Sequence, residues 1–298
     1  MADESNSYRD VLSRRRFVEL TGVSGAAALA GCGGGGDGGD GGSDGDSGTD
    51  TGNTDSSDGS SDGSSGTEVL DFAFSNWIDD NPTDQHFNRY NTTNQTDFSH
   101  FLTFEPTTKW DYGNAEFQNW AITEWEMVDD NTFEFTVDTD ITWSNGDSYT
   151  SQDIATQLRL DKVNNSALWD AVGSIETPDD STVRLNLPDG ANPQLIKIHL
   201  NNLYLHAKHS EFEQYLDGVG EDADETVANE LLSMEIKEPV TNGPFGEPQY
   251  NEQRLLLSRQ DNYHKSENIN FDEYEMRYIQ GNQQVWQELL GNSIDSVW

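Results

Sequence analysis

Few side chains in this 298-residue sequence have the types and spacing that covalent chemistry requires. Cys32 is the only cysteine, so no disulfide can form within the chain. No Gly-x-Ser-x-Gly turn, phosphate-binding glycine loop or His-Glu-x-x-His helix occurs in the sequence. His206 and His209 have a spacing that suits a helical metal site, but without a clear third ligand we interpret them as solvent-facing helix histidines. The sequence favours a protein that is not an enzyme and needs no cofactor.

The residues before Cys32 predict that its thiol carries a lipid. Leu29-Ala30-Gly31-Cys32 is similar to a lipobox, in which the cysteine is acylated and becomes the new N-terminus. Arg14 and Arg15 stand before Phe17 and a short apolar run, a pattern that resembles a twin-arginine export signal. The run is far shorter than the ~20 residues that a membrane-spanning helix needs. We predict that residues 1–32 are a lipoprotein signal peptide that leaves the chain anchored at the extracellular face of the cytoplasmic membrane. The alternative is an amphipathic helix of a cytoplasmic protein.

Residues 33–66 consist almost entirely of Gly, Ser, Asp and Thr, with no Lys or Arg. Such a segment cannot bury enough apolar surface to offset the entropy lost on ordering, and we predict a disordered tether. The folded region is therefore expected over residues 67–298. A tether of this kind would hold a soluble domain close to the membrane that carries its anchor.

The chain has 16 basic and 55 acidic residues and a formal net charge of −39. Such self-repulsion opposes a compact state in dilute buffer, whereas molar salt reduces the Debye length to ~3 Å and screens it. The even spread of Asp and Glu is typical of a halophilic protein. The alternative is an acidic domain for a basic partner. Nucleic-acid binding is disfavoured because it requires a basic surface.

The predicted elements mix strands and helices. Residues 124–128 and 132–137 alternate with period two around a turn and predict a hairpin, and residues 173–176 and 182–187 predict a second one. Thr150 to Asp153 resembles a capping box that opens a helix to about Lys162. We also expect strands at 69–74, 254–258 and 275–279, and helices at 192–200 and 283–290. The fold class is α/β.

Three blocks of the sequence resemble motifs of one family. The segment from Ala121 to Ile154 is similar to "A-x-S-W-E-x-S-D-D-G-x-x-Y-T-F" followed by "W-x-D-G-x-P-x-T-A-x-D-V". The segment from Thr241 to Phe245 is similar to "G-T-G-P-Y", and the segment from Gly291 to Asp295 is similar to "G-x-I-D". Asn262-Tyr263 adds part of "N-P-x-Y". Together they resemble the family-5, peptide/nickel-type solute-binding lipoproteins of ABC importers. Asn131 replaces the glycine of the strand turn, and a basic residue usual before Trp143 is missing.

The resemblance implies a type II periplasmic-binding-protein-like fold, in which a ligand is enclosed between two lobes. Family members have a second lobe of comparable size, so we expect residues 67–298 to form mostly the first lobe. The implied function is capture of a peptide, or else an oligosaccharide or chelated metal, for an ABC permease. The alternative is a lipid-tethered surface-interaction protein built on a truncated receptor lobe, without transport.

Candidate ligand contacts are aromatic. Trp77 and Tyr90 follow the first predicted strand, and clefts in α/β folds lie beyond strand ends. Phe245 belongs to a segment that returns near the cleft in the resembling family. We expect Trp125 in the core, Trp143 and Gly146 in a packed turn, and a tight backbone approach at Gly243.

Overall fold

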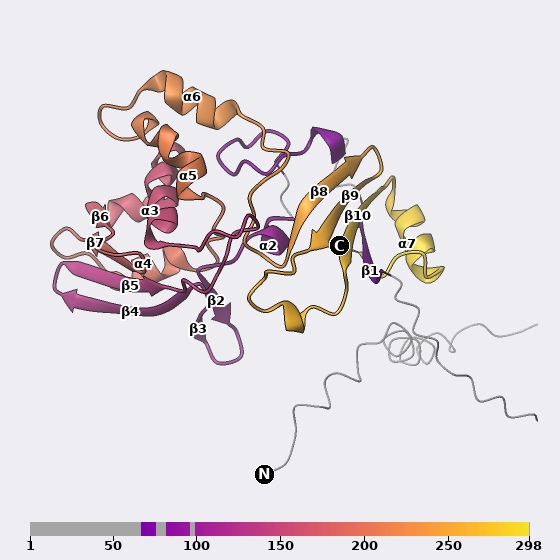
Figure 1. Ribbon diagram of the computed structural model, residues 1–298, viewed down its shortest axis with the longest axis horizontal. Helices are drawn as coiled ribbons and strands as arrows, with labels where there is room; N and C mark the ends of the chain where they lie inside the picture. Colours follow the sequence, from indigo (N-terminus) through magenta and orange to yellow (C-terminus); the bar gives the residue numbers. More distant parts are fainter. Residues whose placement is uncertain (1–66, 76–81, 96–98, 298) are drawn as a thin grey trace, which may run out of the picture. The chain divides into compact units, whose positions relative to one another are not determined.

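The structure is a computed structural model that describes residues 67–75, 82–95 and 99–297 (Figure 1). These residues belong to the unit Gly63–Trp298. The predicted signal peptide and tether, with Arg14, Arg15 and Cys32, lie outside the described residues. In the part of the chain that is described, no helix has the length and apolar character needed to cross a bilayer.

The described chain alternates short strands and helices. Its strands are β1 Val69–Ser75, β2 Thr108–Asp111, β3 Glu116–Asn119, β4 Ile122–Asp129, β5 Thr132–Val137, β6 Ser174–Glu176, β7 Thr182–Asn186, β8 Phe245–Asn251, β9 Arg254–Arg259, β10 Glu273–Ile279 and β11 Ser296–Val297. Its α-helices are α2 His100–Thr103, α3 Ser151–Leu160, α4 Pro193–Leu200, α5 His209–Phe212, α6 Glu225–Ser233 and α7 Asn282–Leu290. The mixed content confirms the α/β fold class.

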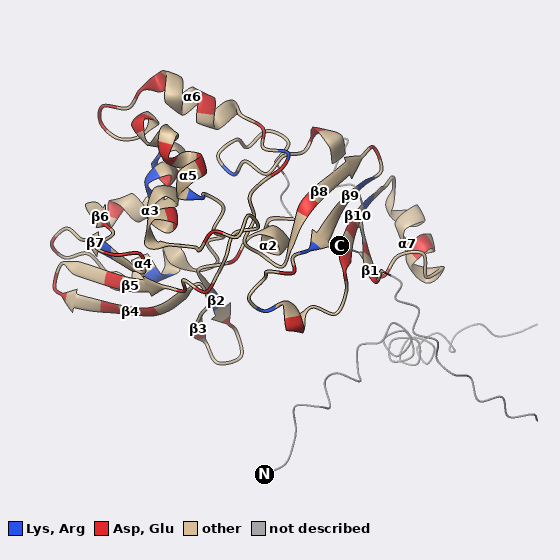
Figure 2. Cartoon of the chain, viewed as in Figure 1, with Lys and Arg blue, Asp and Glu red and all other residues tan. Residues whose placement is uncertain are grey.

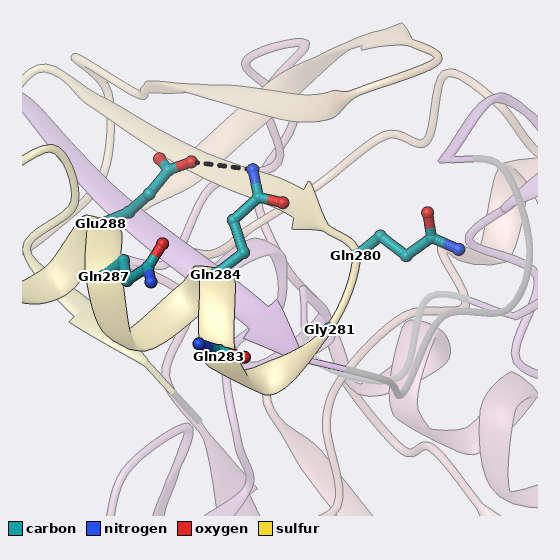
Figure 3. A pocket seen from close by; sticks show the side chains of 6 residues that line it. All are labelled: Gln280, Gly281, Gln283, Gln284, Gln287 and Glu288. Carbon is teal, nitrogen blue, oxygen red and sulfur yellow. Dashed lines mark hydrogen bonds between the residues drawn. The ribbon is translucent and has the colours of Figure 1, made fainter.

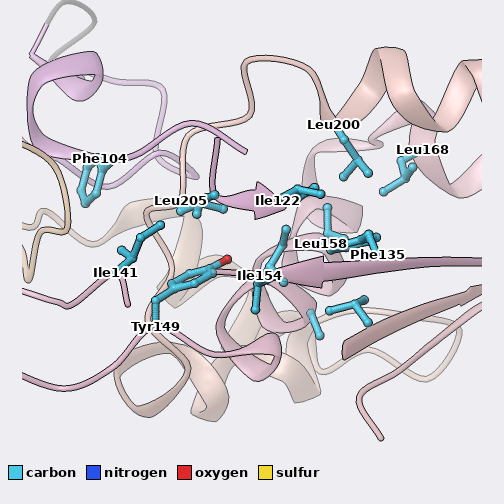
Figure 4. Packing of buried hydrophobic residues seen from close by; sticks show 14 of the residues in the cluster. Phe104, Ile122, Phe135, Ile141, Tyr149, Ile154, Leu158, Leu168, Leu200 and Leu205 are labelled. Carbon is cyan, nitrogen blue, oxygen red and sulfur yellow. The ribbon is translucent and has the colours of Figure 1, made fainter. Parts of the chain in front are cut away.

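Four strands form an antiparallel sheet in the order β4-β5-β7-β6. Both predicted hairpins are therefore confirmed. The alternating pattern buries Phe133 and Phe135 on one face, where they join Val183 and Leu185 in the main hydrophobic core. Helix α3 adds the buried Ile154 and Leu158 to the same core, as predicted (Figure 4).

The start of α3 is fixed by the predicted capping box. The carboxylate of Asp153 accepts hydrogen bonds from the Thr150 amide at 2.8 Å and the Thr150 hydroxyl at 3.1 Å. The same carboxylate accepts the amide N–H of His209 at 2.7 Å and the indole N–H of Trp143 at 3.4 Å. One buried acid therefore joins the helix start to α5 and to the turn at Trp143. In that turn Gly146 has a φ of 89°, which confirms the predicted need for glycine.

Five strands form the second sheet in the order β11-β1-β10-β9-β8. Strand β1 pairs parallel to β10 on one side and to β11 on the other. Helix α7 connects β10 to β11, and its buried Val285 packs with Ala73, Ile279 and Ile294 in a small separate cluster. Gly291 ends α7 as predicted.

The segment before β8 meets the segment after α2 at very close range. A Cβ at Gly243 would lie 2.6 Å from the carbonyl carbon of Thr103. The neighbouring Asn242 side chain accepts the Glu105 amide at 2.9 Å and donates to the Leu205 carbonyl at 3.0 Å. The predicted tight backbone approach is therefore confirmed, and the buried amide of Asn242 joins two further segments there.

Candidate functional site

The parallel pairing of β1 and β10 defines an edge at which both strands end. Their register pairs Val69 with Glu273 and Ser75 with Ile279, so the carboxyl ends of both strands reach the same side of the sheet. Ligands of open α/β sheets bind at this carboxyl edge. After β10 the chain continues through Gln280 and Gly281 directly into α7.

A surface pocket of about 510 Å³ lies at this edge, along α7 (Figure 3). It is lined by Gln280, Gly281, Gln283, Gln284, Gln287 and Glu288. Gly281 precedes the helix with a φ of 90°, a conformation that residues with a Cβ rarely adopt. The buried Val285 fixes the opposite side of α7 against the sheet, so the amide side chains face outward.

The chemistry of this pocket is that of hydrogen bonding. Each glutamine amide offers one carbonyl acceptor and an NH₂ donor, which suits peptide groups and hydroxyl groups alike. The only charged group among the lining residues is Glu288, whose carboxylate lies 3.4 Å from the amide nitrogen of Gln284. Glutamine amides do not ionise near neutral pH. The exposed amides can exchange hydrogen bonds with a polar solute, and the glutamines include no nucleophile or general base.

The predicted contact residues Tyr90 and Phe245 do not line this pocket. Trp77 lies outside the described residues. Tyr90 is 1 % exposed and packs in a second hydrophobic cluster, where its ring centroid is 5.1 Å from that of His206 and 6.0 Å from that of Phe212. Burial raises the pKa of the Tyr90 hydroxyl well above its usual value, with a smaller contribution from the charge of Asp161.

Phe245, at the start of β8, is also 1 % exposed. Its ring stacks on Phe271 with centroids 5.2 Å apart and lies 6.2 Å from the ring of Tyr274. The structure thus accounts for Tyr90 and Phe245 by packing, and ligand contact by either ring stays a prediction. Trp143 is fully buried, and Trp125 is partly buried against the main core, where it was expected.

The two histidines do not form the predicted helical pair. His206 lies outside any helix, and burial lowers its pKa to about 3, so its imidazole is neutral near pH 7. His209 begins α5, and its Nδ1 lies 2.7 Å from the Thr156 hydroxyl. The interpretation of both as solvent-facing helix residues was therefore wrong for His206. Among the described residues, no group of three His, Cys, Asp or Glu side chains could hold a metal ion.

Sequence reasoning missed the amides of the pocket. The signal that could have found them is the run from Gln280 to Gln284, which contains four amide residues directly after a predicted strand. Uncharged amides carry neither the charge nor the periodicity that draws attention in a sequence. Their position at the carboxyl edge gives them significance only once the parallel register of β1 and β10 is known.

Comparison with known structures supports the fold. A mannohexaose-bound periplasmic oligopeptide-binding protein of an ABC transporter from Thermotoga maritima matches with a TM-score of 0.63 and 19 % identity, over 76 % of this chain and 41 % of that one. The mannopinic-acid-bound MoaA from A. tumefaciens matches with a TM-score of 0.56 and 16 % identity, over 77 % of this chain and 44 % of that one. The nickel–histidine-bound NikZ from Campylobacter jejuni matches with a TM-score of 0.54 and 16 % identity, over 76 % of this chain and 42 % of that one.

These likenesses show a periplasmic-binding-protein fold, and this chain spans less than half the length of each of these proteins. No curated protein sequence matches the chain. The sequence model of the bacterial extracellular solute-binding proteins, family 5 (middle part), matches residues 116–298, which is more than half of the chain. The chain therefore belongs to the family-5 extracellular solute-binding proteins, a solute-binding rather than enzymatic class.

Proposed function

We propose that this protein captures a small polar solute outside the cell for an ABC importer, with a peptide as the leading candidate. Membership of the family-5 extracellular solute-binding proteins carries the proposal. Proteins of the same fold are described with mannohexaose, mannopinic acid and a nickel–histidine complex, so an oligosaccharide or a chelated metal are the next candidates. Lobe closure around the solute would favour the state that the permease recognises.

The glutamine pocket along α7 supports capture of an uncharged polar group. Amide hydrogen bonds to peptide or hydroxyl groups do not depend on net charge, and salt screens charge–charge attraction far more than it weakens such bonds. An acid-rich protein that works at high salt would gain specificity from these amides. We place the first solute contacts at Gln283, Gln284 and Gln287.

Export and anchoring belong to the same proposal. Arg14 and Arg15 would direct the chain to the twin-arginine route, and acylation of Cys32 would hold it at the extracellular face of the cytoplasmic membrane. Replacing Cys32 with Ala tests the anchor in the producing cells. The Cys32→Ala protein should appear in the medium, and retention on membranes would contradict lipid attachment.

Calorimetric titration tests capture directly. The full chain in molar KCl is titrated in turn with trialanine, mannohexaose and the nickel–histidine complex. We expect one of the three to bind, and Gln283→Ala with Gln287→Ala to weaken that binding about tenfold, since each lost hydrogen bond is worth ~0.5–1.5 kcal/mol. Gln194→Ala is the matched control, because Gln194 is an exposed residue at the same position of the first turn of α4 as Gln283 is of α7.

Two results would overturn the proposal. If none of the three probes releases or absorbs heat, the chain does not capture these solute classes by itself. If the double variant binds as tightly as the control variant, the solute does not contact the glutamine pocket. Circular dichroism of each variant verifies that the fold is retained.

A further inference from the structure

Three places in the sequence have the Asn-x-Ser/Thr pattern of an N-glycosylation acceptor, a surface feature of exported proteins. They begin at Asn91, Asn94 and Asn164. A glycan at any of them rests on the proposed function, which takes the chain out of the cell. The proposed twin-arginine route permits folding before export, and a folded chain presents its exposed asparagines to a modifying enzyme. The folded structure therefore separates sites that the pattern alone leaves equal.

The Asn91 site is closed by the fold. Asn91 is 7 % exposed, and its Nδ2 donates to the Met234 carbonyl at 3.2 Å. Its Oδ1 accepts the amide N–H of Thr93 at 3.0 Å. The side-chain amide of Asn91 is therefore both covered and hydrogen-bonded at its two ends. The Asn94 site ends in Thr96, which lies outside the described residues.

The Asn164 site is open. Asn164 is the last residue of a short 3₁₀ helix, η2 Asp161–Asn164, which continues α3. Asn164 is exposed, and within the described part of the chain its side-chain amide forms no hydrogen bond. The next residue, Asn165, turns the chain with a φ of 55°. Asn164 thus offers what an acceptor needs, an accessible amide nitrogen that no other group holds.

The third residue of this site, Ser166, supplies the hydroxyl that the pattern requires. The hydroxyl accepts the Leu168 amide at the long distance of 3.4 Å. In the turn itself, the Asn165 amide donates to the Lys162 carbonyl at 3.0 Å. The Ser166 amide donates to the Asp161 carbonyl at 3.2 Å. Short exposed turns at helix ends open more easily than the core, so this segment can unfold locally into the active site of a modifying enzyme.

The charge near the turn suits a sugar donor that carries phosphate. Acidic side chains predominate over the described chain, and its net charge of −39 repels anions (Figure 2). Residues 159–167 are an exception, because they contain Arg159 and Lys162 against one acidic residue, Asp161. The Lys162 ammonium lies 3.6 Å from the centroid of the Trp169 ring and forms no ion pair among the described residues. The local charge therefore does not oppose the approach of a phosphate group.

We propose that Asn164 is an N-glycosylation site whose co-substrate is an oligosaccharide joined through phosphate to a polyprenyl lipid. Its Nδ2 attacks the anomeric carbon of the first sugar. A carbon–nitrogen bond forms while the bond from that carbon to the phosphate oxygen breaks. The phosphate leaves with the electron pair, and Nδ2 loses one proton. Asn164 follows α3, which packs on the four-stranded sheet, so the glycan uses none of the residues of the glutamine pocket on α7.

Mass spectrometry of the full chain, purified from its producing cells and their medium, tests the site. Trypsin cuts after Lys162 and Arg184 and leaves Asn164 in a peptide with no second acceptor pattern. We expect this peptide to be heavier by the mass of whole sugars, with fragment ions that place them on Asn164, and we expect Asn91 to be unmodified. Asn164→Gln keeps an exposed amide and should remove the added mass. Thr93→Ala, the matched control that destroys the buried pattern, should leave it unchanged.

The outcomes separate this site from the export on which it rests. A bare Asn164 on the exported chain would overturn the site and leave export intact. Equal modification of Asn91 and Asn164 would overturn selection by exposure. Ser166→Thr keeps the hydroxyl and should keep the glycan, and its loss would overturn recognition of the pattern. If the chain is found inside the cells alone, with residues 1–32 uncut, the proposed export fails and the site fails with it.

Discussion

The amide nitrogen of Gly243 lies 2.9 Å from the carbonyl oxygen of Thr103, and the two backbones touch. An added Cβ at Gly243 would be 2.6 Å from the carbonyl carbon of Thr103 and 2.7 Å from the carbonyl oxygen of Leu102. Both obstacles are backbone atoms, so no side-chain rotation can relieve the clash. We expect Gly243→Ala to lower the free energy of unfolding by about 3 kcal/mol, measured by urea denaturation.

Gly190→Ala is the matched control for this prediction. Gly190 has a φ of 81° with nothing within 4 Å of an added Cβ, so alanine there meets backbone strain of only about 1 kcal/mol. Equal losses of stability for the two variants would show that close packing at Gly243 is not the controlling factor.

Asp153 supports a second stability prediction. Its carboxylate accepts four hydrogen bonds and is 4 % exposed, so Asp153→Ala leaves several buried donors without an acceptor. We expect a loss of about 3 kcal/mol for Asp153→Ala in urea denaturation. Asp153→Asn retains one acceptor oxygen and should lose clearly less. If both variants lose the same amount, acceptor capacity is not what Asp153 contributes.

Asp161 at the end of α3 makes stability depend on pH. Burial raises the pKa of its carboxyl to about 7. Because the folded-state pKa lies above the ordinary value, the folded chain binds more protons than the unfolded chain between these two values. The contribution of Asp161 is therefore fully present in acid and is lost as the pH rises through about 7, by an amount on the order of 4 kcal/mol.

The difference in unfolding free energy between wild type and Asp161→Asn, measured from pH 4 to 8, isolates this effect. We expect the wild type to lose stability relative to the variant as the pH rises. Asp170→Asn, at an exposed position, should show no such trend. A constant difference between wild type and Asp161→Asn would contradict the raised pKa.

The net charge of −39 predicts a strong dependence of stability on salt. We expect Tm to rise steadily between 0.1 and 2 M KCl, because the Debye length falls from ~10 Å to ~3 Å by 1 M and self-repulsion is screened. Differential scanning calorimetry measures this, with sucrose as an uncharged control for general solute effects. A Tm that is flat in KCl, or that rises equally in sucrose, would argue against electrostatic self-repulsion.

Local sequence signals predicted much of the fold. The period-two run at 132–137 follows a turn-forming Asp129-Asp130-Asn131, and the structure places the Asn131 amide 2.8 Å from the Asp129 carboxylate. The capping box and the glycine that ends α7 were found for the same reason, because each depends on residues that are close together in the sequence. Strand β8 was missed because it contains Gly246 and Pro248, both of which disfavour strands, and its pairing shifts register there.

The candidate site was less predictable. An aromatic residue that follows a strand suits a cleft and a core equally well, and the difference depends on distant partners such as Phe212 for Tyr90 and Phe271 for Phe245. Those contacts are set by tertiary packing that no local pattern reports. The glutamines of α7 could be recognised as a candidate site only from the parallel register of two strands about 200 residues apart, which places them at the carboxyl edge of the sheet.

That same register has a consequence for synthesis. Strand β1 lies between β10 and β11, so its partners leave the ribosome long after it does. At roughly 5–20 residues per second, β1 waits on the order of 10–40 s with both of its edges unpaired. During this delay a chaperone, or the negative charge on the rest of the nascent polypeptide, must prevent β1 from pairing with a neighbouring nascent chain. Completion of the five-stranded sheet therefore has to wait until β10 and β11 have been synthesised.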